Sequence, residues 1–237
     1  MSSLEKVLEQ IRTSFEQSRA EQDVWYLVAA VALSALNHPE DIPTLYSMVT
    51  ATIDALIVDT VENEQARINA TKRLREALLK GFIATGFPKA INSLDYLNRA
   101  IPEQIKSKLP KKAIRSEDTW KEVVEHRKRG NALFAKIYDR HTDRVLTNMD
   151  SFYPDLCQTA LHQIYGPIIS DTTVLSGKES SIVLVTGLKA TDVASQLRGH
   201  YYGALHQGAT KEELACIGVA VDLLCQHYKL PIPKAKL

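Results

Sequence analysis

An apolar run that ends in prolines is the feature that most constrains this fold. Trp25 to Leu36 is apolar at nearly every position and rich in alanine, and Pro39 and Pro43 then interrupt helical hydrogen bonding. A helix that is apolar all round is buried on every face. The run is well short of the roughly 20 residues that span a bilayer. We therefore predict a globular protein built around a central helix, without membrane insertion.

Helical periodicity continues on both sides of this run. Residues 1–19 carry one apolar stripe and predict an amphipathic helix, which a capping box between Ser2 and Glu5 would open. Two further helices are predicted between residues 45 and 82, before the Gly-Phe-Pro break at 86–88. The first half of the chain is thus expected to be helical.

Residues 101–149 change to alternating charge and predict a connector that includes a surface helix. Acidic residues stand among the lysines and arginines there, which is typical of a solvated face rather than of a basic docking patch. We assign this segment no chemistry.

The pattern of helices restarts in residues 150–230. A helix from about Asp192 to His206 would be closed by Gly208 as a left-handed cap. Thr210 and Glu213 then form a capping box for the last long helix. Together these two helices predict a tight helical hairpin.

Two glycines interrupt the first helix of that hairpin. Gly199 and Gly203 lie four residues apart and leave one face of the helix without side chains. Each costs roughly 1 kcal/mol against alanine inside a helix, so the pair needs a reason in packing or binding. We expect another helix to approach closely there.

The composition excludes several classes of partner and site. The 29 Lys and Arg residues nearly cancel the 28 Asp and Glu residues, so no overall field favours nucleic acid. Cys157, Cys216 and Cys225 have no zinc-site spacing and are too few for a disulfide framework. No glycine-rich phosphate loop or metal-binding motif is present. We therefore expect no cofactor and no metal.

The last three residues have the composition of a targeting signal. Ala235, Lys236 and Leu237 are a small residue, a basic residue and a leucine, and they resemble the type 1 peroxisomal targeting signal. Prolines just before them exclude helix, so we predict that residues 231–237 form an extended and accessible tail. This predicts a peroxisomal matrix location and the peroxisomal import receptor as a partner.

Residues 196–214 resemble the carboxymuconolactone decarboxylase and alkylhydroperoxidase D-like superfamily. The specific part is a histidine followed by Gly-Ala-Leu, Gly-Ala-Thr and Glu-Glu. Residues 75–94 resemble the last helix of the same family, so the chain looks like two diverged copies of one unit, over 20–100 and 150–230. The resemblance implies an all-α, AhpD-like fold and a homo-oligomer. It also overrules the strand propensity of the β-branched run at 181–186.

The family's functional residues carry over only in part. Val193 and Gln196 stand where the peroxidase branch has its two cysteines, so a thiol peroxidase of that type is excluded. The family's glutamate falls on Ser181, while Glu179 points elsewhere on the helix. The family's histidine is present as His200. The decarboxylase branch, which does not use the cysteines, stays open.

His200 is the main candidate for catalysis, because an imidazole exchanges protons near neutral pH. Gln196, one turn earlier, is a second catalytic candidate that would bond the ring or a substrate carbonyl. Arg198 and Tyr201 are substrate-binding candidates, and Arg198 suits a carboxylate. The alternative for His200 is a helix histidine bonded to a neighbouring group.

Three functions follow from these residues. The first is a decarboxylase, isomerase or hydrolase that acts through His200 on a small carboxylic acid, lactone or acyl thioester. The second is a non-catalytic binding or scaffold protein that keeps the fold without the family's cysteine pair and glutamate. The third, peroxide removal through Cys216 or Cys225, requires an exposed thiol beside a base.

Overall fold

The computed structural model describes residues 3–17 and 24–237, and every regular element in them is helical. This confirms the all-α prediction. Ser2, the expected capping residue of the first helix, lies outside the described residues. In chain order the α-helices are α1 (Ser3–Gln17), α2 (Trp25–Ala35), α3 (Ile42–Leu56), α4 (Thr60–Thr85), α5 (Phe87–Ala100), α6 (Glu103–Lys106), α7 (Trp120–Tyr138), α8 (Thr142–Phe152), α9 (Pro154–Thr159), α10 (Gly177–Ala190), α11 (Ala194–His206) and α12 (Lys211–His227). A π-helical segment, η4, covers Ala160–Ile169, and short 3-10 turns cover Pro39–Asp41 and Asp139–His141.

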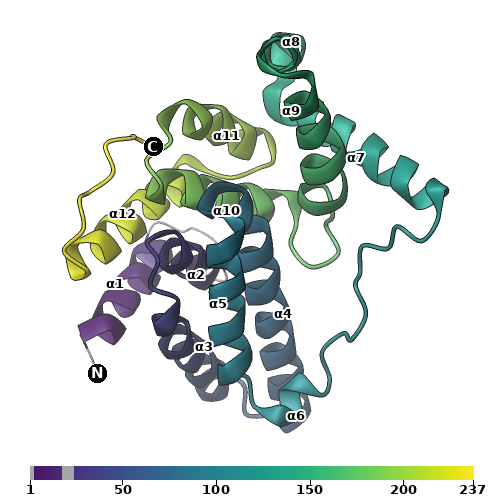
Figure 1. Cartoon of the computed structure of the whole chain (residues 1–237). Helices are drawn as coiled ribbons and strands as arrows, with labels where there is room; N and C mark the ends of the chain where they lie inside the picture. The colour runs from purple at the N-terminus through teal and green to yellow at the C-terminus, as the bar shows by residue number, and fades with distance from the viewer. Residues whose placement is uncertain (1–2, 18–23) are drawn as a thin grey trace.

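Helix α2 is the centre of the molecule, as its composition predicts. Every residue from Trp25 to Ala35 is buried, and the helix packs against α4, α10 and α12 (Figure 1). The main core therefore draws side chains from both predicted units, 20–100 and 150–230. Division into two copies stays a prediction.

Helix ends in the first half follow their capping residues. Asp59 accepts hydrogen bonds from the backbone N–H groups of Val61 and Glu62 and so begins α4. Gly86 ends that helix with φ +97°, a conformation that favours glycine. Pro88 then stands in the first turn of α5, where a missing N–H costs nothing.

The ends of the last two helices are as predicted, but the prediction of a tight hairpin is wrong, because α11 packs against α10 and α7 while α12 packs against α1, α10 and α2. Gly208 separates α11 from α12 with φ +98°, and Thr210 and Glu213 form the expected capping box. The β-branched run at 181–186 lies within α10, whose residues Ser180–Lys189 are all buried. Tertiary burial has therefore overridden the strand propensity of this run.

The glycine face of α11 meets α7, as the sequence predicts. A Cβ atom on Gly203 would lie 2.5 Å from Cγ2 of Ile137, and one on Gly199 would lie 3.3 Å from Cε1 of Tyr138. The glycines let the two helices approach at this distance. Packing explains their position.

The prediction of a solvated connector is wrong for one face of α7, which is buried. The charged face of the helix is exposed, but Phe134 and Ile137 belong to a second core cluster with Tyr165 and Ile169 of η4. Trp120, at the start of α7, is 68% exposed. The coil at 107–119 is mostly exposed, although Leu109 within it is buried in the main core.

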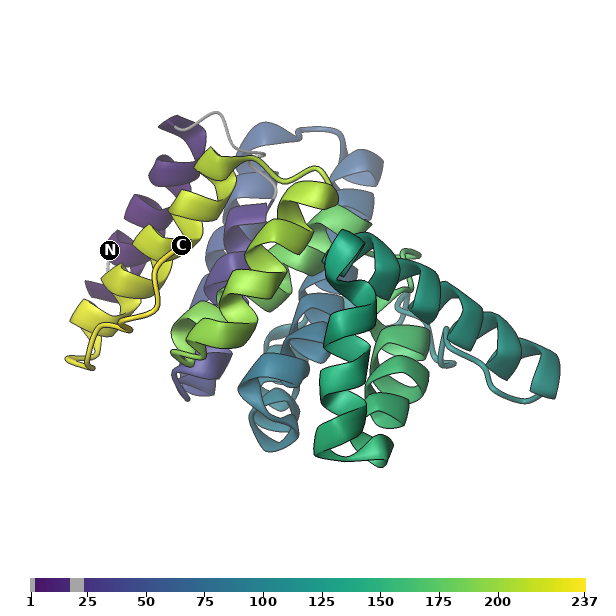
Figure 2. The ribbon, with the colours of Figure 1, turned by 90° about the horizontal axis from the view of Figure 1, so that it is seen from above.

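Different groups of helices form the two ends of the molecule. Helices α1 and α12 pack side by side at one end, and α7, α8 and α9 form the other (Figure 2). Among the described residues, no helix is long and apolar enough to cross a membrane.

Candidate functional site

His200 lies on α11 and faces the aromatic side of α7. Its ring centroid is 6.2 Å from that of Tyr138, in an edge-on arrangement. Desolvation by burial lowers the pKa of His200 to about 4, so the imidazole is neutral at neutral pH. Within the described parts of the chain, no side chain or carbonyl group forms a hydrogen bond with its ring.

The predicted partners of His200 do not gather around its ring. Gln196 and Arg198 are exposed side chains of the same helix. Tyr201 is half-buried against the main core and contacts the ring of Tyr202, with centroids 5.5 Å apart. The four predicted site residues, His200, Gln196, Arg198 and Tyr201, therefore do not form an enclosed catalytic cluster.

Ser181, which the predicted resemblance aligns with the AhpD-like glutamate, lines a small cavity of about 210 Å³. Its hydroxyl group donates to the carbonyl of Gly177, 3.0 Å away. Glu179 points to α4, as expected, where it forms an ion pair with Arg73. Neither residue supplies an acid to His200.

The cysteines do not form a peroxide site. Cys216 and Cys225 are buried in α12, whereas peroxide removal requires an exposed thiol. Burial is the largest cause that raises the pKa of Cys225, and the nearby Asp222 carboxylate adds to it. A raised pKa leaves less thiolate to attack a peroxide.

The prediction that the carboxyl-terminal tail is accessible is wrong. Residues 231–237 are extended, but Ala235 is only 5% exposed and belongs to the main core. Leu237 packs partly buried beside it, with Cδ1 at 3.8 Å from the Cβ position of Gly218. Only Lys236 of the tripeptide is exposed.

Two charged side chains hold this tail to the body. The Lys189 Nζ atom donates to the carbonyl oxygens of Pro233, at 3.1 Å, and Ala235, at 3.0 Å. The backbone N–H of Ala235 donates to Oδ1 of Asp192 at 2.7 Å. That hydrogen bond is the largest cause that lowers the pKa of Asp192. The tail is thus bound by its backbone.

A buried charge network is the feature that sequence reasoning missed. Lys80 is fully buried and donates to the carbonyl oxygen of Asp171, at 2.5 Å, and to the hydroxyl of Ser180, at 2.7 Å. Glu76, one turn earlier, lies 3.6 Å from the Lys80 Nζ atom and also pairs with Arg115. Burial lowers the pKa of Lys80 to about 8. The Glu76 and Lys80 spacing on one helix was the available signal.

The hydrogen-bond partners of Lys80 indicate a structural role for its side chain. Its ammonium group has three N–H bonds, and two of them go to Asp171 and Ser180, while the third is directed between Glu76 and the Ile169 carbonyl. These partners fix the turn that joins η4 to α10. A lysine whose protons are all shared in this way is a poor nucleophile.

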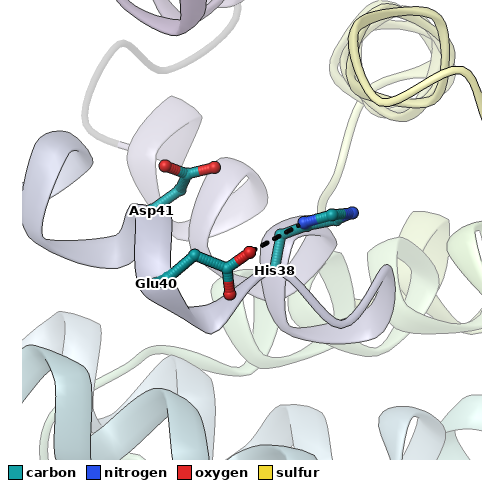
Figure 3. A group of neighbouring side chains, drawn as sticks. All are labelled: His38, Glu40 and Asp41. Carbon is teal, nitrogen blue, oxygen red and sulfur yellow. Dashed lines mark hydrogen bonds and ion pairs between the residues drawn. The ribbon is translucent and has the colours of Figure 1, made fainter.

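A second polar cluster lies at the turn between α2 and α3. His38, Glu40 and Asp41 offer metal-ligand atoms within 4.8 Å of one another (Figure 3). The His38 Nδ1 atom already bonds to Glu40 at 3.0 Å, and the Tyr228 hydroxyl donates to Asp41. The His38 and Tyr228 rings also stack, with centroids 3.5 Å apart. These contacts tie the end of α12 to the turn and explain the cluster without an ion.

The comparisons with known proteins give relatives but no fold family. Peroxisomal protein 2 of Schizosaccharomyces pombe is 36% identical over 189 residues, which cover 80% of this chain and 79% of that protein. Peroxisomal protein 2 of Saccharomyces cerevisiae is 30% identical over 246 aligned positions, which cover 84% of this chain and 87% of the relative. No family model and no solved structure matches the chain. The AhpD-like resemblance accordingly stays a prediction.

Proposed function

The chain belongs to the peroxisomal protein 2 family, and on that premise we propose that it serves in the peroxisomal matrix as a ligand-binding protein. Ala235, Lys236 and Leu237 would be its import signal. The names of the relatives and the chemistry of the tripeptide support the compartment independently of each other. The state of His200 supports binding rather than turnover.

The observation that carries the binding function is the isolation of the His200 ring. A general acid or base works best when its pKa is close to the working pH and a second group orients it. The pKa of His200 is about 4, and Gln196 and Arg198 point into solvent. An imidazole in this state transfers protons poorly at neutral pH.

Acid or base chemistry at His200 is the second candidate function. The observation in its favour is that the ring is neutral and retains a nitrogen lone pair for a substrate proton. The reaction would be decarboxylation, isomerisation or hydrolysis of a small carboxylic acid, lactone or acyl thioester.

One experiment separates the two functions. The purified protein and the His200→Ala variant are each incubated with a small-molecule extract of peroxisomes, and mass spectrometry compares the mixtures. We expect identical free metabolites after incubation, with one species retained on both proteins after gel filtration. A metabolite that the parent protein consumes and the folded variant spares would replace binding with catalysis.

The compartment is tested in fungal cells with a fluorescent protein fused ahead of residue 1. We expect the full chain to coincide with a peroxisomal marker and the chain without residues 235–237 to remain diffuse. Retention of the truncated chain in peroxisomes would remove the tripeptide as the import signal.

A further inference from the structure

A large cleft lies beside α4, and His200 is not among the residues that line it. Its volume is about 740 Å³, within the range of roughly 300 to 1,000 Å³ that is typical of small-molecule sites. One wall is α4 between Asn69 and Leu79, and the opposite wall is the coil at 110–115. Leu94 of α5 and Val174, just before α10, close the sides.

Arg115 fixes the coil wall in place. It donates through Nε to the carbonyl of Pro167, at 2.8 Å, and forms an ion pair with Glu76 at the base of the cleft. Its guanidinium also lies 3.8 Å from Oδ1 of Asp171. The coil therefore joins α4 and η4 into one rigid rim, and the cleft is formed before any ligand binds.

Three positive charges on the cleft have no counterion. Lys72, Arg75 and Lys112 line it, and in the described part of the chain none of them forms an ion pair. The other two cations of the lining are paired, Arg73 with Glu179 and Arg115 with Glu76. Unpaired cations that converge on a concave surface focus a positive potential there and attract anions.

Apolar side chains line the same cleft. Leu79 and Leu94 are half-buried, and Ile114 is exposed on the coil wall. Val174 adds a fourth apolar group. Apolar walls with a few charged groups at fixed places are typical of sites for amphipathic small molecules.

We propose that this cleft binds a small organic anion that carries at least two negative charges on an apolar body. Lys72, Arg75 and Lys112 hold the charged head, and Leu79, Leu94 and Ile114 contact the apolar body. A phosphate monoester and a dicarboxylate share this chemistry. The proposal supplies a ligand class for the proposed binding function and rests on it for its biological role.

Titration calorimetry of the full chain tests the site with defined probes. We expect octyl phosphate to bind, octanol and octylammonium to bind far more weakly, and added salt to weaken the binding of octyl phosphate. Octylmalonate, which has two carboxylates at one end of an apolar chain, distinguishes a dicarboxylate site from a phosphate site in a parallel titration. Tighter binding of either anion supports the cleft and names its head group.

Matched variants locate the binding. We expect Arg75→Gln combined with Lys112→Gln to weaken octyl phosphate binding by about tenfold or more, which corresponds to about 1.4 kcal/mol of binding free energy. Lys121→Gln, an exposed change on α7 outside the cleft, should leave it unchanged. Both substituted cations lie at the surface, and circular dichroism confirms that the variants fold.

Two results would overturn the proposal. One is the absence of heat with either anion, and the other is binding that the Arg75 and Lys112 changes leave intact. Either result removes the cleft as the site but leaves untouched the separate extract and localisation experiments, so failure here and failure of the proposed function are distinguishable.

Discussion

Gly130 of α7 crosses Gly166 of η4 so closely that a Cβ atom on Gly130 would lie 2.5 Å from the backbone nitrogen of Gly166. The same Cβ atom would lie 2.6 Å from the Cα atom of Gly166. Real Cβ atoms essentially never approach backbone atoms so closely, and a backbone cannot move aside as a flexible side chain can. The crossing of these two helices therefore requires glycine at residue 130.

We expect Gly130→Ala to lower the free energy of unfolding by about 3 kcal/mol, because the methyl group forces the two helices apart. Urea denaturation measures the change. Gly218→Ala is the matched control, since a Cβ atom there would meet only Leu237 Cδ1 at 3.8 Å. The control should be neutral or slightly stabilising through its gain in helix propensity. Equal effects of the two changes would contradict the close crossing.

The docked tail should weaken recognition of the whole protein by the import receptor. We expect the full chain to bind the receptor's peptide-binding domain less tightly than a free peptide of residues 231–237. The peptide does not have to break the Lys189 and Asp192 hydrogen bonds with Ala235 before it binds. Fluorescence anisotropy competition measures both affinities.

Removal of the two docking groups tests the cause of that difference. Lys189→Ala and Asp192→Ala should bring the affinity of the full chain closer to that of the free peptide. Lys211→Ala, an exposed change at the start of α12, should leave it unchanged. Equal binding by full chain and peptide at the outset would show that docking does not compete with the receptor.

The His200 ring should titrate far below the usual range. Burial disfavours its charged form, so we expect a protonation midpoint near pH 4 instead of 6.5. Because the unfolded state binds more protons between these values, the histidine should lower the free energy of unfolding as the pH falls from 6.5 towards 4. Nuclear magnetic resonance of the imidazole protons, assigned with His200→Gln, follows the midpoint. A midpoint near 6.5 would contradict a desolvated ring.

Lys80 should make the free energy of unfolding depend on pH in the alkaline range. The pKa of Lys80 falls from 10.5 to about 8 on folding, so the unfolded chain binds more protons between these values. The free energy of unfolding should therefore rise from pH 8 to 10.5, by up to about 3 kcal/mol relative to Lys80→Met. Urea denaturation at several pH values measures the difference. Lys72→Met, at a half-buried position of the same helix, keeps Lys80 and should therefore show the same rise as the parent protein.

Patterns of local periodicity and capping allowed much of the fold to be predicted. The apolar run of α2, the Gly208 cap and the Thr210 and Glu213 capping box all depend on neighbours in sequence, so the chain itself displays them. The close approach at Gly203 was predicted for a related reason, because a glycine inside a helix is costly without close packing.

Features that depend on distant parts of the chain were missed. The burial of Ala235 requires Lys189 and Asp192, more than 40 residues earlier, and an extended tail rich in proline carries no local sign of them. The cleft similarly combines α4 with the coil at 110–115, which the charge pattern marks only as solvated. For His200, the sequence supplies the helix and the residue type but not the burial that lowers its pKa.

The pairing of α1 with α12 has a consequence for how the chain folds. Cys216 contacts the carbonyl of Ser14 across a separation of 202 residues, and α1 packs against α12. Contacts so remote in sequence slow folding, because a long loop must close before they form. During synthesis, Leu8, Ile11 and Phe15 remain without α12 until the ribosome has passed residue 227. The nascent chain therefore presents this stripe to chaperones for most of its translation.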